Sequence, residues 1–326
     1  MKPMRSWRNS ASQAATGTRP ATTRVRPGAG LHPRFGWLRT QTSQRYLAAL
    51  LLSLPALVSL ILFNFLPIVE TVRFSLNDYN IYTRELAWAG NKQYVVALSD
   101  RTLIRSVSTT LQYFALKVPV EMVLALGLAL LVRQPGRGVS VLRTIILLPT
   151  ITSMVVVSTV WGMMYSPNSG LFNSILQSLG LPPQPFLTSP GQALPAVAVI
   201  TIWKDIGLYM LFYLAGLMNI PTDYYDAARV DGANGLELLR HITVPLLNRT
   251  TVFVLVTSTI TAFKVFVPVK ILTDGGPAGA TRVIVLYMFD LAFRYSRFGY
   301  AAAVAVLLAA VLLAISLIQY RLTRGR

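Results

Sequence analysis

Long apolar runs separated by short polar stretches dominate the chain. A bilayer core about 30 Å thick needs roughly 20 apolar residues of α-helix to cross it, with every backbone amide paired inside the segment. Six runs meet that requirement, covering approximately residues 46–69, 106–132, 144–165, 194–218, 251–272 and 300–320. The pattern therefore predicts an all-α integral membrane protein with six transmembrane helices and a membrane domain over residues 46–320.

The regions between and within these runs carry smaller signals. Pro55 and Pro67 are predicted to kink the first span. The link 73–105 is mixed in charge and too long for a simple loop, so it is expected to contain an ordered region with a helix or two. Residues 282–293 are apolar but short and include Asp290, which favours an interfacial segment over a seventh span.

The basic residues indicate which ends of the spans face the cytosol. The chain holds 30 Lys and Arg against 12 Asp and Glu, and short cytosolic loops retain Lys and Arg. Residues 1–45 carry basic residues and no acid, as do the link 133–143 and the end 321–326. We expect residues 1–45 to form a disordered cytosolic tail, and both termini to be cytosolic. The uncharged link 166–193 is then outside.

Composition narrows the function classes. The chain is 53% hydrophobic and 13% charged, whereas soluble domains average about 25% charged residues. Its basic residues lie between apolar runs without interleaved aromatics, so no nucleic-acid partner is expected. The basic tail can attract anionic membrane lipid by about 1 kcal/mol per residue near the surface, or serve only as a topology signal.

Several chemical signatures are missing from the sequence. Cysteine is absent and only two histidines occur, so no metal site is expected. No phosphate-binding G-x(4)-G-K-[ST] motif, HExxH or GxSxG occurs. We therefore predict no catalytic residue, no bound cofactor and no ATP hydrolysis in this chain.

The link between the fourth and fifth spans, residues 220–249, faces the cytosol in this orientation and predicts two short helices at an angle. Pro221 suits a first helical turn, and Asp223 and Asp226 suit the positive end of that helix. Gly232 can adopt the left-handed conformation that ends a helix. Asn234 with Glu237 resembles a capping box for the second helix, which Pro245 then limits.

This elbow offers a surface for a partner. Ala227 and Ala228 leave room for close approach, and the neighbouring acids can pair with basic residues of another protein. The plainer alternative is a loop that packs only against its own helices.

The same residues resemble the EAA motif of ABC importer permeases, E-A-A-x(2)-D-G-A-x(5)-F-x(2)-I-x-L-P. The matching positions, which the resemblance assigns to coupling with an ATPase, are Asp226, Ala227, Ala228, Asp231, Gly232, Ala233, Leu239 and Pro245. Asp226 replaces the family's opening Glu, and Leu239 replaces its aromatic residue. Arg249 stands where a second Pro is frequent, which affects only the entry to the fifth span.

Further segments are similar to the carbohydrate-uptake permeases, the group of the maltose and glycerol-3-phosphate importers. They are Phe74–Asn77, Gly170–Asn173, Leu214–Leu217, Thr273–Pro277 and Phe298–Tyr300. The resemblance implies the type I permease fold, with residues 220–249 as the coupling helix, in the plasma (inner) membrane of a prokaryote. It also implies a sugar-class substrate, a second permease subunit forming a heterodimer, an extracytoplasmic solute-binding protein, and two ATPase subunits that hold ATP and Mg²⁺.

Polar groups inside the spans are candidates for the transport pathway, because charges at bilayer depth are costly and usually face a cavity or a partner. The candidates are Glu121, Trp203, Lys204, Asp205, Tyr209, Phe263 and Lys264. Lys117 and Glu121 lie four residues apart, so an ion pair within one helix is an equally good reading. Lys204 and Asp205 are adjacent and not expected to pair along one face, so at least one needs a partner elsewhere. Ordinary packing between helices explains such residues equally well.

Three other functions remain alternatives at this point. The nearest is an ABC importer permease for a non-sugar solute such as an amino acid, phosphate or metal. A stand-alone secondary carrier would be expected to show inverted repeats and matching broken helices, and neither is visible in the sequence. A membrane scaffold or enzyme would not associate with an ATPase.

Overall fold

The computed structural model describes residues 41–80, 83, 85–134 and 136–324. Residues 1–40 of the predicted tail, and residues 325–326 of the predicted cytosolic end, lie outside the described residues. The chain divides into two compact units, Met1–Leu60 and Ile61–Arg326. In the first unit, helix α1 (Gln41–Leu60) begins five residues before the predicted start of the first span. Its described side chains are all exposed, as expected of a helix that meets lipid or another protein.

The second unit begins with a π-helical turn, η2 (Ile61–Phe65), followed by α2 (Leu66–Ser75). Pro67 lies in the first turn of α2, where its missing amide costs no hydrogen bond. The irregular turn therefore falls just before Pro67, close to the predicted kink.

Within the described residues, five helical stretches are long and apolar enough to cross a membrane, and a bent helix pair makes a sixth where it is taken as one span. They are Ala48–Ser75, Arg101–Leu131, the pair Arg137–Ile151 and Met154–Met164, Ala193–Met218, Asn248–Leu272 and Phe298–Arg321. The fold is therefore that of an all-α membrane protein with six spans. The elements that form the last five are α4 (Arg101–Leu131), α5 (Arg137–Ile151), α6 (Met154–Met164), α8 (Ala193–Met218), α12 (Asn248–Phe263), α13 (Val267–Leu272) and α15 (Phe298–Arg324).

The third span differs from the continuous helix expected over residues 144–165. It starts earlier, at Arg137, and bends by 98° between α5 and α6. Thr152 and Ser153 are extended at the bend, three residues after Pro149. The fifth span is also interrupted, between Phe263 and Val267. Both breaks free backbone groups within the spans, which is tolerated where they meet protein or water.

The link between the first and second spans contains a β-hairpin that was not expected, as well as one helix. Strands β1 (Asn77–Asn80) and β2 (Glu85–Trp88) pair antiparallel, with Asn77 opposite Trp88. The helix is α3 (Lys92–Ser99). The link between the third and fourth spans carries α7 (Leu171–Ser178) and a short 3₁₀ turn, η3 (Phe186–Thr188).

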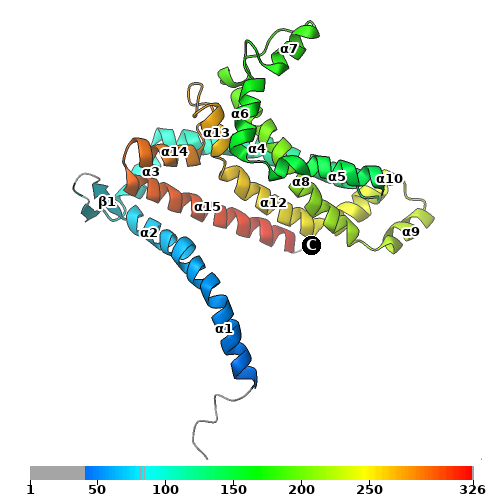
Figure 1. The fold of residues 1–326 in the computed structure, drawn as a ribbon, viewed down its shortest axis with the longest axis horizontal. Coiled ribbons are helices and arrows are strands. Elements are labelled where there is room, and N and C mark those ends of the chain that lie inside the picture. Colours follow the sequence, from blue (N-terminus) through cyan, green and yellow to red (C-terminus); the bar gives the residue numbers. More distant parts are fainter. Residues whose placement is uncertain (1–40, 81–82, 84, 135, 325–326) are drawn as a thin grey trace, which may run out of the picture. The chain divides into compact units, whose positions relative to one another are not determined.

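The centre of the second unit is built around α4 and α8, which pack along each other, with α5 and α12 against them (Figure 1). Gly207 of α8 allows a close crossing with α5, because an added Cβ there would overlap the carbonyl oxygen of Ile146. Small residues at such crossings let membrane helices approach closely.

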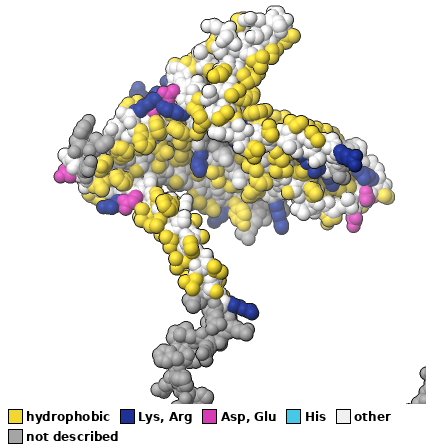
Figure 2. Space-filling view, viewed as in Figure 1, with side chains coloured by type: hydrophobic (Ala, Val, Ile, Leu, Met, Phe, Trp, Pro, Cys, Tyr) yellow, Lys and Arg dark blue, Asp and Glu magenta, His cyan; other side chains and the backbone are white. Residues whose placement is uncertain are grey.

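A short helix lies at the other side of this core. Residues 282–293, expected to be interfacial, form α14 (Ile284–Phe289) and a π turn, η5 (Asp290–Arg294). Leu286 and Leu291 are buried there, so this segment packs against the other helices, and its depth in the membrane stays a prediction. Hydrophobic side chains nevertheless cover much of the visible surface, as a lipid-facing protein requires (Figure 2).

Candidate functional site

The link after α8 forms the predicted elbow. Helix α9 (Thr222–Val230) ends at Asp231, and Gly232 has φ +84°. The amide of Ala233 donates to the carbonyl of Ala228 at 2.9 Å, and that of Gly232 donates to Arg229 at 3.1 Å. These two bonds form a Schellman motif, the helix ending that a left-handed glycine permits. The prediction for Gly232 is confirmed.

The second arm starts with the predicted capping box. Asn234 Oδ1 accepts from the amides of Leu236 and Glu237, while Glu237 Oε2 accepts from the amide of Asn234 at 2.7 Å. Helix α10 (Gly235–Leu238) continues through a π turn, η4 (Leu239–Thr243), into α11 (Val244–Leu246). The backbone groups at the end of α9 and at the start of α10 therefore find hydrogen-bond partners within the elbow, which fixes the angle between its two arms.

Three details of the elbow differ from expectation. Pro221 is the residue just before α9, at the N-cap position, and not part of its first turn. Asp226 lies in the second turn, where it pairs with Arg229 at 3.2 Å on an exposed surface, an interaction worth little. Pro245 does not end the second arm, because the wider η4 precedes it and the chain stays helical to Leu246.

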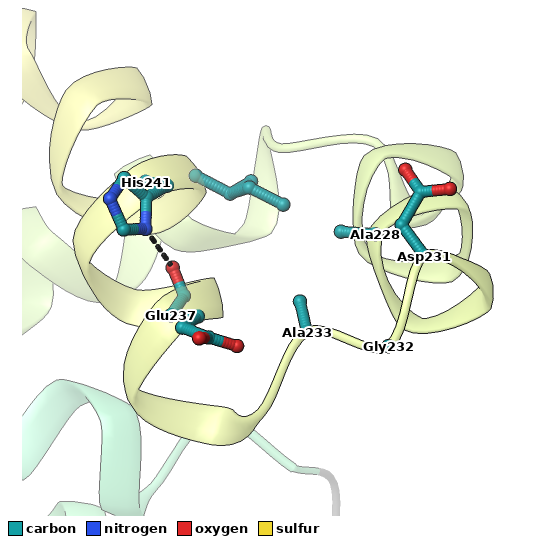
Figure 3. A pocket seen from close by; sticks show the side chains of 7 residues that line it. Ala228, Asp231, Gly232, Ala233, Glu237 and His241 are labelled. Carbon is teal, nitrogen blue, oxygen red and sulfur yellow. Dashed lines mark hydrogen bonds between the residues drawn. The ribbon is translucent and has the colours of Figure 1, made fainter.

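A pocket of about 390 Å³ opens between the two arms. In Figure 3, Ala228 and Asp231 approach it from α9 while Glu237 and His241 lie across it, with Ala233 and Gly232 at the connecting turn. His241 Nδ1 lies 3.2 Å from the carbonyl oxygen of Glu237. Four of the predicted coupling residues thus line one concave surface: Ala228, Asp231, Gly232 and Ala233.

The other predicted coupling residues lie around this pocket. Asp226, Ala227 and Pro245 are exposed, and Leu239 is half-buried. Sequence reasoning missed two exposed apolar residues, called the apolar rim here, that precede the lining residues Asp231 and Glu237 in the chain: Val230 is 88% exposed and Leu236 is 73% exposed. Exposed apolar side chains beside a concave surface are typical of a protein-binding site. Their position on the polar elbow, away from the apolar spans, was the signal available in the sequence.

Tyr225 anchors the elbow to the membrane helices and was also missed. Its side chain is buried, and its hydroxyl forms a hydrogen bond with Thr243 Oγ1 at 3.1 Å that joins the two arms. The Arg133 guanidinium lies over its ring at 4.6 Å from the centroid, within cation–π range. Arg133 follows the α4 span, so a displacement of the elbow reaches α4 directly.

A buried charge network joins α4 to α8. Lys117 Nζ lies 3.3 Å from Glu121 Oε1 and 3.0 Å from Asp205 Oδ2. Ser258 Oγ of α12 donates to Glu121 Oε2 at 2.5 Å. The expected pair within α4 is present, and Asp205 has the partner on another helix that the sequence required.

Lys204 and Asp205 also approach each other, at 3.9 Å, contrary to the expectation that adjacent residues would not pair. Lys204 Nζ donates to the carbonyl oxygen of Thr150 at 3.2 Å, and Thr150 Oγ1 donates back to the carbonyl oxygen of Lys204 at 3.0 Å. These reciprocal bonds hold the end of α5 against α8 at the bend of the third span.

The remaining pathway candidates fall into two groups. Glu121, Tyr209 and Phe263 are buried within the subunit, so their side chains offer no surface to a solute in this conformation. Trp203 and Lys264 are exposed, and Asp205 is partly exposed. Their contact with a solute stays a prediction.

Trp203 lies at the edge of an aromatic cluster. Trp161 of α6 lies 5.4 Å from Trp203 between ring centroids, and it also contacts Tyr165 and Phe172. Sequence reasoning noted Trp203 and missed Trp161, because the bend between α5 and α6 brings it there. Exposed indole surface can stack on the apolar face of a sugar ring. In the described part of the chain, no group of three or more His, Asp or Glu is arranged to hold a metal ion.

Solved structures with the same architecture are importers. The chain superposes on a bacterial ABC transporter involved in the import of the acidic polysaccharide alginate with a TM-score of 0.75, at 26% identity, covering 87% of this chain and 98% of that one. A second structure, an alginate ABC transporter in complex with a pentasaccharide-bound periplasmic protein, gives 0.76 at 24% identity, over 88% and 98%. The fold is the type I permease fold.

Curated sequences show similarity over most of the chain. The trehalose/maltose transport system permease protein MalF of Thermococcus litoralis is 33% identical over 276 residues, 85% of this chain and 93% of that protein. The lactose transport system permease protein LacF of Rhizobium radiobacter is 31% identical, over 83% and 92%. Residues 101–326 match the family model described as binding-protein-dependent transport system inner membrane component. The chain therefore belongs to that family of transport permeases.

Proposed function

We propose that this chain is one permease subunit of an ATP-driven, binding-protein-dependent importer of a sugar or sugar-like solute. A second permease subunit and two ATPase subunits, which bind ATP and Mg²⁺, complete the importer, and one of the ATPase subunits docks on the elbow of residues 222–246 of this chain. A solute-binding protein delivers the solute from outside. The solute class is an oligosaccharide, a disaccharide or a glycerol phosphate, since similar permeases belong to transport systems for trehalose/maltose, lactose and sn-glycerol-3-phosphate.

The elbow carries this proposal. It combines a pocket of about 390 Å³ with exposed apolar rim residues and internally satisfied helix ends. A rigid, concave, partly apolar projection suits insertion of a partner's side chains. Tyr225 links it to Thr243 and Arg133, so closure of the ATPase subunits would rotate the ends of the spans and alternate access between the two sides.

The exposed aromatic surface of Trp203, backed by Trp161 and flanked by Lys204 and Asp205, supports the sugar class. Stacking on indole and hydrogen bonding to charged groups are complementary ways to hold a hydroxylated ring. The orientation follows the basic loops, with both termini and the elbow on the cytosolic side of the inner membrane.

The decisive experiment substitutes Gly232 in the complete, reconstituted importer. Gly232→Val places a side chain at φ +84°, which costs roughly 1 to 2 kcal/mol and tilts the elbow. Gly235→Val is the matched control, because neither glycine has another group within 4 Å and no positive φ occurs at Gly235. We expect Gly232→Val to reduce solute-stimulated ATP turnover and sugar uptake severalfold, while Gly235→Val retains both.

The same preparation separates the alternatives. A Gly232→Val complex that assembles and turns over ATP like the parent contradicts the coupling role of this turn. Solute uptake by the purified chain without any ATPase identifies a stand-alone carrier. A cognate binding protein that holds an amino acid, phosphate or metal in place of a sugar retains the importer and rejects the solute class.

A further inference from the structure

Two pockets adjoin at the N-terminal end of α4, the end that the proposed orientation places outside. The first, which we call the arginine pocket, has a volume of about 380 Å³ and is lined by Arg101, Arg105, Ser106, Ala278, Gly279 and Arg282. The adjoining pocket, of about 450 Å³, shares Arg105 and Gly279 and continues along Ser108, Thr109 and Gln112. Both volumes fall in the range of small-molecule sites.

The three arginines of this pocket have no acidic partner. Within the described residues, no carboxylate lies within ion-pair distance of Arg101, Arg105 or Arg282. The neighbouring Asp100 is fully engaged, since it accepts bonds from the amides of Thr102 and Leu103 and from the hydroxyls of Tyr287 and Tyr300. The pocket therefore carries an uncompensated positive charge.

Two buried polar atoms of residues that line the pocket lack hydrogen-bond partners. Ser106 is 1% exposed and its Oγ is unpaired. Arg282 Nε is likewise buried and unpaired. Leaving such a group unsatisfied costs about 1 to 3 kcal/mol. Rotation of these two side chains toward the pocket would bring both donors to a ligand with oxygen acceptors, and a carboxylate matches the fork of an arginine side chain.

The lining of the adjoining pocket indicates what carries that carboxylate. Arg105, Ser108 and Gln112 lie at helical spacing on an exposed face of α4, and Gln112 Nε2 donates to Ser108 Oγ at 3.3 Å. Polar side chains on the exposed face of a spanning helix favour a solvated path over lipid contact. A surface that only docks another protein would end at the mouth of the pocket, whereas the lining of the adjoining pocket continues along α4 into the membrane span. Hydroxyl and amide groups there suit sugar hydroxyls.

We propose that the arginine pocket binds the carboxylate of an acidic saccharide, a uronic-acid sugar, whose neighbouring rings lie along Ser108, Thr109 and Gln112. This inference rests on the proposed sugar-import function and names the solute class within it. Arg101, Arg105 and Arg282 select the acid at the outer mouth. Lys264, exposed and without a carboxylate within ion-pair distance in the described residues, continues the positive bias inside the spans.

The test measures binding to the full-length chain, assembled with its partner permease and ATPase subunits in lipid nanodiscs, by calorimetric titration. The probes are α-1,4-linked trigalacturonate, the neutral galactotriose of the same linkage, and acetate. We expect trigalacturonate to bind at least tenfold more tightly than galactotriose, and more weakly as salt rises. Arg105→Gln should raise its Kd about tenfold, equivalent to about 1.4 kcal/mol, while Arg105→Lys keeps part of the affinity. Galactotriose binding should not change.

Arg137→Gln is the matched control, because Arg137, like Arg105, is an exposed arginine near the N-terminus of a spanning helix, and the proposed orientation places it on the opposite side of the membrane. Equal affinity for the acidic and neutral trisaccharides, or no loss with Arg105→Gln, overturns the inference. Acetate binding as tightly as trigalacturonate overturns the saccharide assignment. Weakened association of the solute-binding protein with Arg105→Gln, without a change in trisaccharide binding, identifies a docking surface instead.

Uptake distinguishes failure of this inference from failure of the proposed function. If the parent importer takes up galactotriose but no trigalacturonate, or if Arg105→Gln takes up trigalacturonate as well as the parent does, the arginine pocket plays no part and the sugar importer stands. If the parent complex takes up no sugar at all, the proposed function itself is wrong.

Discussion

At the residue scale, Asp100 joins three parts of the protein through one carboxylate. Oδ1 caps α4 by accepting from Thr102 at 2.8 Å, and Oδ2 accepts from Tyr287 at 2.5 Å and Tyr300 at 2.7 Å. Burial raises the pKa of this carboxyl, but the bonds from the two tyrosines and from the amides of Leu103 and Thr102 outweigh burial and lower the pKa. The ionised form is therefore the one that the fold stabilises.

The lowered pKa gives a pH prediction with a definite sign. The folded-state pKa of Asp100 lies below the unfolded value of about 3.9. The stabilisation of the fold by the ionised carboxylate is therefore complete above about pH 3.9, and it is lost as the pH falls through the folded-state pKa. Asp100→Asn keeps the helix cap but removes the charge, so we expect a loss of about 2 kcal/mol at pH 7 that shrinks below pH 4. Thermal unfolding of parent and variant in detergent across pH 3 to 7 measures this.

Asp78→Asn is the control for that series, since Asp78 is exposed and forms only a 3.8 Å ion pair with Lys92. Such surface pairs contribute less than about 1 kcal/mol. A difference between Asp100→Asn and the parent that stays constant from pH 7 to pH 3 would contradict the assignment of the charged form.

The buried network makes a second prediction at this scale. Lys117 is 2% exposed at its side chain and pairs with both Glu121 and Asp205. Lys117→Met leaves the buried Glu121 without a cation and Asp205 with only the 3.9 Å contact to Lys204, and removal of one partner of a buried pair costs about 3 to 5 kcal/mol. We expect a lower unfolding temperature for Lys117→Met than for Lys264→Met, in which the lysine is exposed. Adding Glu121→Gln to Lys117→Met should recover part of the loss.

At the element scale, the sequence predicted those features that depend on nearby residues. The elbow was predictable because its Schellman ending and its capping box each involve residues within five positions of one another. The spans were predictable from the length of apolar runs. The 98° bend was not, because the bonds between Thr150 and Lys204 that hold it join residues 54 positions apart. The contact of Tyr225 with Arg133 is equally remote in sequence.

The crossing of α5 and α8 offers a test of how closely these elements pack. An added methyl at Gly207 would overlap the carbonyl oxygen of Ile146 and lie 3.1 Å from Leu147 Cα, both backbone atoms that cannot rotate away. We expect Gly207→Ala to destabilise the protein by about 1 to 3 kcal/mol, seen as a lower unfolding temperature. Gly127→Ala in α4 has no neighbour within 4 Å and should be neutral or slightly stabilising. Equal behaviour of the two variants would mean that the helices cross further apart.

At the scale of the whole molecule, the fold class and family were predictable from the sequence, whereas the arrangement of charges around the pathway was not. Periodicity and length determine how many helices form, but they do not indicate which polar residues face inward. Glu121 and Tyr209 were candidates for solute contact, and tertiary packing buries both. The arginine pocket was equally hidden in the sequence, because Arg282 joins Arg101 and Arg105 only when the link after α13 folds over the end of α4.

The orientation of the whole protein is the last prediction, and the absence of native cysteine makes its test direct. Val230→Cys on the elbow and Leu179→Cys in the link between the third and fourth spans introduce thiols at exposed positions, 88% and 68% exposed in the parent. A membrane-impermeant maleimide added to intact cells should label Leu179→Cys at once and Val230→Cys only after permeabilisation. Leu313→Cys, exposed within the last span, should resist labelling in both cases, because a thiol in lipid does not ionise. Labelling of Val230→Cys in intact cells would place the elbow outside, where no ATPase could reach it.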